Sequence, residues 1–195
     1  MRNLFILLLG TILLLACSPE TSEENATPLG DWRHHGGNHR SEKYSPLDQV
    51  NGSNFGLLEV AWRYRSPDLE LPEELAYPTG DYRAMPLVIN GVMYVNSNHG
   101  LISALDPVTG EEHWVFDPKS YEYGPPLFSP LQTRGIEYWT DGNIERLFIA
   151  TSGKQLVSVD IETGQPDPNF GDDGYVDLRE NFGRFEFEMN NITHG

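Results

Sequence analysis

An internal repeat limits the fold of this chain more than any other feature of its sequence. Segments 92–110 and 146–164 align without a gap, so that Asp106 corresponds to Asp160, 54 positions later. Each copy consists of a β-forming run, a short turn, a second β-forming run and then Asp-x-x-Thr-Gly. A repeat of somewhat more than about 40 residues in a β-rich chain is typical of propeller blades.

The sequence around the repeat is also β-like. Short runs rich in Val, Ile, Tyr, Phe and Trp alternate with Gly, Pro and an Asn-Gly pair, and no long segment has helical periodicity. Asn90-Gly91 predicts a two-residue hairpin, because both residues tolerate a positive φ. A further outer strand at 57–64 is placed to complete another blade and close a ring. We expect two four-stranded blades, with strands at 85–89, 92–97, 101–105, 113–116, 135–139, 146–150, 156–159 and 175–178.

The turn that ends each copy has a physical basis. The Asp106 carboxylate and the Thr109 hydroxyl can accept hydrogen bonds from amides inside the turn. Gly110 can adopt a left-handed conformation there without a Cβ clash. The small Ala104 before the turn and Trp114 after it would let the indole cover the turn and pack between neighbouring blades.

The second copy departs from the first at two positions. Ser158 stands where the first copy has Ala, and Pro168 stands where it has Trp. We therefore expect a weaker or restructured outer strand, with 169–174 as a long turn. Two blades cannot close a ring without leaving apolar faces and open edges. We expect the chain to be the N-terminal part of a longer propeller.

The first residues are typical of an export signal. Arg2 precedes the apolar run Leu4–Ala16, which is shorter than the roughly 20 residues that a spanning helix needs. The end of the run before Cys17 resembles a bacterial lipobox, which implies cleavage before Cys17 and a lipid on its thiol. An ordinary signal peptide with an incidental Cys is the alternative. Ser18 resembles the outer-membrane sorting signal, so we expect an exported protein, lipid-anchored on the periplasmic side of the outer membrane.

The predicted organisation has three parts. They are a signal peptide at 1–16, a lipidated Cys17 with a disordered acidic tether at 17–30, and the propeller part at 31–195. The formal net charge of −16 argues against a nucleic-acid partner, since phosphate binding needs clustered Lys and Arg.

Three stretches together resemble a known family. They are 32–62, which contains Trp32 and Tyr44-Ser45-Pro46-Leu47; 86–114, which ends at the Trp114 motif; and 134–174, which opens Arg134-Gly135-Ile136-Glu137-Tyr138-Trp139. Their order and spacing are similar to those of the pyrroloquinoline quinone (PQQ) dependent dehydrogenases, in particular the membrane-type glucose dehydrogenase branch. The resemblance implies an all-β, quinoprotein-type β-propeller whose complete form has eight blades.

The resemblance assigns cofactor contacts to three residues. Arg134 matches the family's Arg that binds a PQQ carboxylate, and a guanidinium suits that group; a surface Arg is the alternative. His99 matches a place where the glucose dehydrogenase branch often has His, so it could bond a quinone oxygen or a sugar hydroxyl; an exposed turn His is the alternative. Arg83 replaces a Glu of the family and could pair with another PQQ carboxylate, but it cannot ligate Ca²⁺.

Other family features are missing from this chain. The segment 128–133, directly before Arg134, has no Cys or His to stack on the cofactor. The resemblance implies that the catalytic Asp and the calcium ligands come from later blades. We therefore predict no catalytic residue and no metal ligand here. His34, His35 and His39 could suggest a metal site, but no second ligand cluster appears in the sequence.

The resemblance implies that the complete protein is an enzyme. It would oxidise a hydroxyl group of a sugar or an alcohol with PQQ and Ca²⁺ and would pass electrons to a quinone or a cytochrome, whereas the part seen here would be inactive. The alternative is a non-enzymatic propeller lipoprotein that acts as an outer-membrane assembly scaffold. The lipid signal and the missing stacking residue favour the scaffold, and the stretches 32–51 and 134–139 favour the enzyme.

Overall fold

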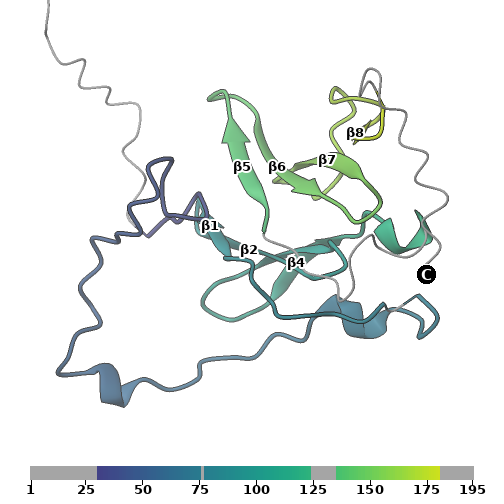
Figure 1. Cartoon of the computed structure of the whole chain (residues 1–195). Coiled ribbons are helices and arrows are strands. Elements are labelled where there is room, and N and C mark those ends of the chain that lie inside the picture. The colour runs from purple at the N-terminus through teal and green to yellow at the C-terminus, as the bar shows by residue number, and fades with distance from the viewer. Residues whose placement is uncertain (1–29, 76, 124–134, 181–195) are drawn as a thin grey trace, which may run out of the picture.

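The computed structural model describes residues 30–75, 77–123 and 135–180. The predicted signal peptide, Cys17 and Arg134 lie outside these residues. Within them the chain forms two four-stranded antiparallel sheets and short 3-10 helices (Figure 1). No helix in these residues is long or apolar enough to span a membrane.

The strands follow one another in each sheet, so that sequence neighbours are also neighbours in space. The first sheet has the order β1 (Leu87–Ile89), β2 (Val92–Asn96), β3 (Ile102–Leu105) and β4 (Glu112–Phe116). The second has the order β5 (Glu137–Thr140), β6 (Glu145–Ala150), β7 (Gln155–Asp160) and β8 (Tyr175–Asp177). The 3-10 helices are η2 (Phe55–Leu57), η3 (Pro67–Glu70) and η4 (Ser120–Tyr123). All eight predicted blade strands are present within one or two residues of the predicted bounds.

The hairpin prediction at the start of the first sheet is confirmed. Ile89 pairs with Val92, which leaves Asn90 and Gly91 as the two turn residues. Their φ angles are 51° and 79°, which is the left-handed pair that a type I′ turn requires.

The two Asp-x-x-Thr-Gly turns have the predicted bonds. Asp106 accepts hydrogen bonds from the amides of Val108 (2.7 Å) and Thr109 (2.8 Å), and the Gly110 amide donates to the Asp106 carbonyl (2.8 Å). These backbone donors lower the pKa of Asp106. Gly110 has φ +74°, a conformation that a side chain would strain.

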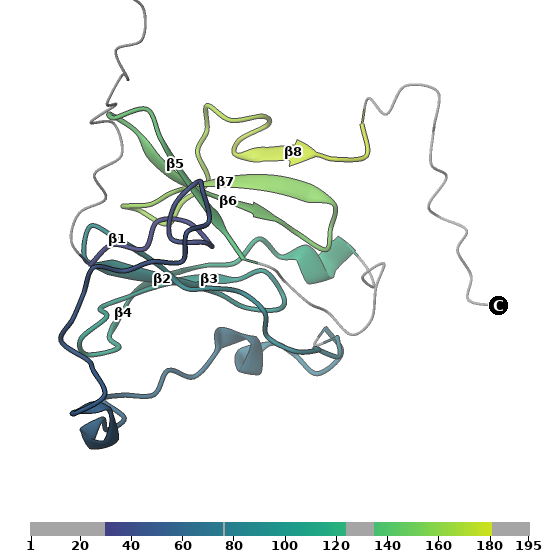
Figure 2. The same ribbon diagram turned by 60° about the vertical axis from the view of Figure 1, so that its left-hand side comes forward.

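The second sheet is stacked on the first, and the core lies between them (Figures 1 and 2). The Tyr94 hydroxyl crosses this layer and donates to the Ile161 carbonyl at 3.3 Å. Trp114 of β4 packs between the sheets as predicted, but it covers the turn of the second sheet rather than the turn at Gly110 that precedes it. A Cβ on Gly164 would lie 2.5 Å from its indole. The core cluster consists of the buried residues Leu87, Ile89, Tyr94, Ile102, Ala104, Phe116, Ile136, Tyr138, Leu147, Ile149, Val157, Val159 and Ile161.

The second copy of the repeat departs from the first as predicted. After Gly164 the chain forms a long loop before β8, and β8 has only three residues. In that loop Asp167 pairs with Arg146 of β6 at 2.6 Å, and both side chains are largely buried. This ion pair fixes the loop where Pro168 replaces the tryptophan.

The prediction of a strand at 57–64 is wrong. Leu57 ends η2, and 58–64 has no strand assignment because no strand among the described residues lies beside it to complete a ladder. Its side chains nevertheless make specific contacts. A Cβ on Gly110 would lie 2.6 Å from the Trp62 indole, and Trp62 Nε1 donates to the Pro107 carbonyl at 3.1 Å. Trp62 therefore packs against the turn glycine of the first sheet in the same way as Trp114 packs against the turn glycine of the second sheet.

Candidate functional site

A cavity of about 610 Å³ lies between segment 64–82 and the first sheet. In Figures 1 and 2 this segment runs along the side of β1–β4 that faces away from β5–β8. The cavity is lined by polar and aromatic side chains, among them Tyr64, Asp68, Tyr77, Tyr82, Asn96 and His99. No Lys or Arg is among the described residues that line it.

His99 lies in the loop between β2 and β3, as predicted, but it is not an exposed turn residue. Only 4% of its surface is accessible. The loop is held by the Leu101 amide, which donates to Ser97 Oγ at 3.0 Å, and by Ser120 Oγ, which donates to the His99 carbonyl at 2.6 Å. The imidazole therefore has a fixed position at the cavity wall.

The partner of His99 comes from the other wall. Its Nδ1 lies 3.0 Å from Oδ2 of Asp68, a residue of η3, and both side chains are largely buried. Burial by itself would raise the pKa of Asp68, but hydrogen bonding with His99 and Ser97 outweighs it and lowers this pKa below its usual value. Nε2 of His99 has no hydrogen-bond partner among the described residues, so the pair leaves one buried imidazole nitrogen for another group.

Tyr64 connects segment 64–82 to the strands of the first sheet. Its hydroxyl lies 2.9 Å from Oγ of Ser103 and 2.5 Å from Oε2 of Glu112. Burial and the hydrogen bond to Glu112 raise the pKa of Tyr64 to about 12, so the phenol stays neutral and acts as a donor. A cavity of neutral phenols, amides and hydroxyls with one Asp–His pair suits an uncharged hydroxylated ligand better than a polyanion.

The predicted cofactor residues are not brought together by the described structure. Arg83 is exposed, and its guanidinium lies 3.3 Å from Oδ2 of Asp81. It follows Tyr82, which lines the cavity, but it does not line the cavity itself. Arg134 lies outside the described residues. The Asp68–His99 pair had no signal in the sequence, because a lone Asp in a loop is common.

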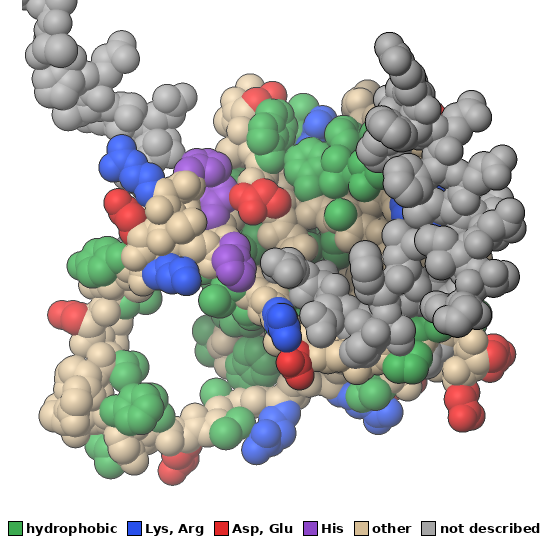
Figure 3. Space-filling view, viewed as in Figure 1, with side chains coloured by type: hydrophobic (Ala, Val, Ile, Leu, Met, Phe, Trp, Pro, Cys, Tyr) green, Lys and Arg blue, Asp and Glu red, His purple; other side chains and the backbone are tan. Residues whose placement is uncertain are grey.

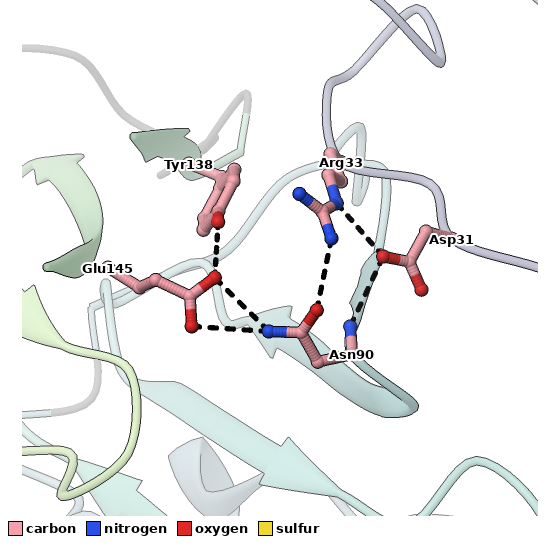
Figure 4. Close-up of polar contacts among 5 residues, drawn as sticks. All are labelled: Asp31, Arg33, Asn90, Tyr138 and Glu145. Atoms are coloured by element: carbon pink, nitrogen blue, oxygen red, sulfur yellow. Dashed lines mark hydrogen bonds and ion pairs between the residues drawn. The ribbon is translucent and has the colours of Figure 1, made fainter. Parts of the chain in front are cut away.

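A second polar assembly joins the N-terminal segment to both sheets (Figure 4). Arg33 contacts Asp31 at 2.9 Å and donates to Oδ1 of Asn90 at 3.0 Å. Asn90 donates through Nδ2 to both carboxylate oxygens of Glu145 at 3.1 Å, and the Tyr138 hydroxyl also donates to Glu145. Burial and this last bond raise the pKa of Tyr138 to about 12. Asn90 is thus the bridge between the two sheets at this end.

Comparison with known proteins gives one consistent result. Residues 32–194 match the family model of the PQQ glucose/ethanol/alcohol dehydrogenase β-propeller domain. The chain is 30% identical over 172 residues to the quinoprotein glucose dehydrogenase of Gluconobacter oxydans, which covers 81% of this chain and 21% of that protein. It is 33% identical over 146 residues to the dehydrogenase subunit of the alcohol dehydrogenase (quinone) of the same organism. This alignment covers 74% of this chain and 17% of that protein.

A solved structure agrees with these relatives. The quinohemoprotein alcohol dehydrogenase of Pseudomonas putida HK5 aligns with a TM-score of 0.59 at 26% identity, over 78% of this chain and 20% of that one. The predicted propeller architecture is thereby confirmed. The chain spans about a fifth of the length of the curated relatives that it matches.

Proposed function

Because the chain belongs to the PQQ glucose/ethanol/alcohol dehydrogenase β-propeller family, we propose that it is the N-terminal part of a dehydrogenase. The complete protein would oxidise a hydroxyl group of a sugar or an alcohol. The observation that carries the proposal is the family match over residues 32–194. The contact of Trp114 with Gly164, which joins the two sheets, agrees with it. The similar proteins include an alcohol dehydrogenase (quinone) and a 1-butanol dehydrogenase (cytochrome c), which supports a quinone or a cytochrome as the electron acceptor.

PQQ would supply the two-electron oxidising group. The described cavity does not fit this cofactor, because PQQ is a tricarboxylate and no Lys or Arg lines the cavity, whereas Asp68 does. We assign a PQQ carboxylate to Arg134, whose guanidinium can form two parallel bonds to it. Arg83 would bind a second PQQ carboxylate in place of Asp81, with which it now makes a surface ion pair. The calcium ligands and the catalytic base would come from the rest of the protein.

His99 has a separate role in the proposal. Its buried Nε2, which lacks a partner among the described residues, would bond an uncharged hydroxyl oxygen of the substrate. Asp68 would orient the ring through Nδ1. Because the bonded group is a substrate hydroxyl, His99→Gln is expected to raise KM for the substrate more than it lowers kcat.

The test of the proposed function uses the full-length protein. It is reconstituted with PQQ and Ca²⁺, and reduction of an artificial dye is followed with a panel of sugars and primary alcohols. Activity that depends on PQQ supports the proposal. PQQ binding without turnover, or no binding, contradicts it, and the scaffold interpretation would then take its place.

A pair of variants tests the cofactor contact. Arg134→Ala is expected to weaken PQQ binding by at least ten-fold, which corresponds to about 1.4 kcal/mol for a lost charge-assisted bond. Arg40→Ala is the matched control, since Arg40 is an exposed residue of the N-terminal segment. Equal affinity in both variants would remove Arg134 from the cofactor site.

We also propose that the protein is exported and lipid-anchored through Cys17. The support is the apolar run that ends directly before the only Cys of the chain. Metabolic labelling with a fatty acid, followed by fractionation of the membranes, tests this proposal. Label that persists in Cys17→Ser would contradict it.

A further inference from the structure

Two histidines of the N-terminal segment and one carboxylate of the second sheet lie together. His34 Nδ1 is 2.5 Å from Oε1 of Glu137, the first residue of β5. The rings of His34 and His39 have their centroids 3.9 Å apart. One ligand atom from each of the three residues lies within 4.8 Å of the other two. Figure 3 shows histidine and acidic side chains side by side on this exposed face.

The backbone that carries the histidines is folded tightly on itself. The Gly37 amide donates to the His34 carbonyl at 2.8 Å, and the Lys43 amide donates to the Gly36 carbonyl at 2.8 Å. A Cβ on Gly36 would lie 2.5 Å from Cα of Ser41, and Gly37 has φ +86°. The two glycines therefore permit the turn that brings His39 back to His34.

Both sides of the cluster are fixed to the fold. Trp32, two residues before His34, exchanges backbone hydrogen bonds with Val88 of β1 at 2.7 and 3.0 Å. Glu137 is paired with Phe148 of β6. Since the ligand atoms are held from two independent elements, little ordering is needed for an ion to bind.

We propose that His34, His39 and Glu137 bind one divalent transition-metal ion of the Zn²⁺ class. Two imidazoles and a carboxylate suit this class, whereas Ca²⁺ takes six to eight oxygen ligands. Ligands at about 2.0–2.1 Å from a tetrahedral ion are about 3.3 Å apart, which small side-chain rotations provide from the present separations. The fourth position is open to water, since Glu137 and His39 are exposed.

A metal ion bound at this site would link the N-terminal segment to β5. It extends the sequence-based expectation, in which His34, His35 and His39 lacked a second ligand cluster. Glu137 supplies that ligand from a distant part of the chain, while His35 is exposed and outside the cluster. Zn²⁺ should therefore slow amide exchange in 32–41 without changing exchange in β7.

The test measures Zn²⁺ binding to the full-length protein. The protein is purified without a histidine tag, stripped with a chelator and titrated with Zn²⁺ alone against a chromophoric competitor. We expect one tight ion in the unaltered protein and at least a ten-fold weaker affinity in His39→Ala. The His35→Ala and His113→Ala variants are matched controls and should retain the affinity, since both residues are exposed and outside the cluster.

The His39→Ala variant is decisive because the ring of His39 is exposed and its loss leaves the His34–Glu137 contact in place. Glu137→Gln and His34→Ala should weaken binding as well. In the Co²⁺-substituted protein, visible absorption bands of a tetrahedral ion should disappear in His39→Ala. Zn²⁺ affinity that is unchanged in His39→Ala, or lost equally in His35→Ala, would overturn the proposal. Neither readout uses dehydrogenase activity, so the outcome is independent of the proposed function.

Discussion

The indole of Trp114 lies against Gly164 of the next sheet, so closely that an added Cβ would be 2.5 Å from its Cδ2 atom. Trp62 has the same relationship to Gly110, at 2.6 Å. The contact between a tryptophan and a turn glycine thus occurs twice. It joins segment 58–64 to the first sheet, and it joins the first sheet to the second. Each time a tryptophan on one unit covers the turn of the next, which is how successive blades of a propeller can be held in register.

Gly164→Ala should destabilise the protein by about 2–5 kcal/mol. The substitution strains a left-handed position, at about 1–2 kcal/mol, and overpacks the Trp114 contact, at about 1–3 kcal/mol. Gly91→Ala is the matched control: its φ is +79° against +69° for Gly164, but an added Cβ would meet nothing within 4 Å. Denaturant unfolding of both variants measures the difference. Equal losses of stability would mean that the indole contact has no steric role.

Trp62→Ala should release segment 58–82 from the first sheet. The variant loses the indole contact with Gly110 and the hydrogen bond to the Pro107 carbonyl. For a half-buried tryptophan we expect a cost of about 1–3 kcal/mol, less than for a fully buried one. Limited proteolysis should show faster cleavage within 58–82, whereas Leu58→Ala, at an exposed position of the same segment, should be cleaved like the unaltered protein. Unchanged cleavage in Trp62→Ala would contradict the anchoring role.

The strands and turns could be predicted because their signals are local. Asn90-Gly91 fixes a hairpin by the φ angles that the two residues tolerate, and Asp106 and Gly110 fix a turn by bonds within five residues. The wrong prediction, a strand at 57–64, has the same origin. Trp62 and Tyr64 do face the first sheet, but a strand also needs a neighbouring strand.

The polar sites could not be predicted, because each is built from distant segments. Asp68 meets His99 across the cavity, and His34 meets Glu137 across 103 positions of the chain. The acidic residue of each pair carries no mark in the sequence, since an isolated Asp or Glu in a loop is most often a solvated surface residue. The family resemblance pointed to His99 but not to its partner Asp68.

Asp68→Asn should reduce stability at neutral pH but not in acid. The pKa of Asp68 is lowered in the folded protein, so its ionised contacts stabilise the fold above the unfolded value of 3.8. That stabilisation is lost as the pH falls through the lower, folded value. We expect a difference of about 1–3 kcal/mol at pH 7, which shrinks progressively below about pH 4.

Unfolding free energies at several pH values, for Asp68→Asn and the unaltered protein, measure this effect. Asp81→Asn is the control, because Asp81 is exposed and its contact with Arg83 is a surface ion pair of small value. A loss of stability in Asp68→Asn that is the same at pH 7 and at pH 3 would show that the carboxylate charge is not what matters.

The bridge at Asn90 allows a test in which the turn is kept and only the charge changes. Asp suits the same left-handed position as Asn in a two-residue hairpin, so Asn90→Asp should leave the Asn90-Gly91 turn intact. It replaces the amide that donates to both oxygens of Glu145 by a second carboxylate. Repulsion and two lost hydrogen bonds should destabilise the protein by about 1–3 kcal/mol at neutral pH.

The double variant Asn90→Asp/Glu145→Gln reverses the direction of this bond. The Gln amide can donate to the new carboxylate, while its oxygen still accepts from the Tyr138 hydroxyl. The Asp carboxylate also keeps an acceptor for Arg33. The double variant should therefore recover most of the lost stability, with a coupling energy of about 1–2 kcal/mol in a double-mutant cycle. Additive losses would mean that Asn90 and Glu145 act independently, and that the hydrogen bonds between them do not join the two sheets.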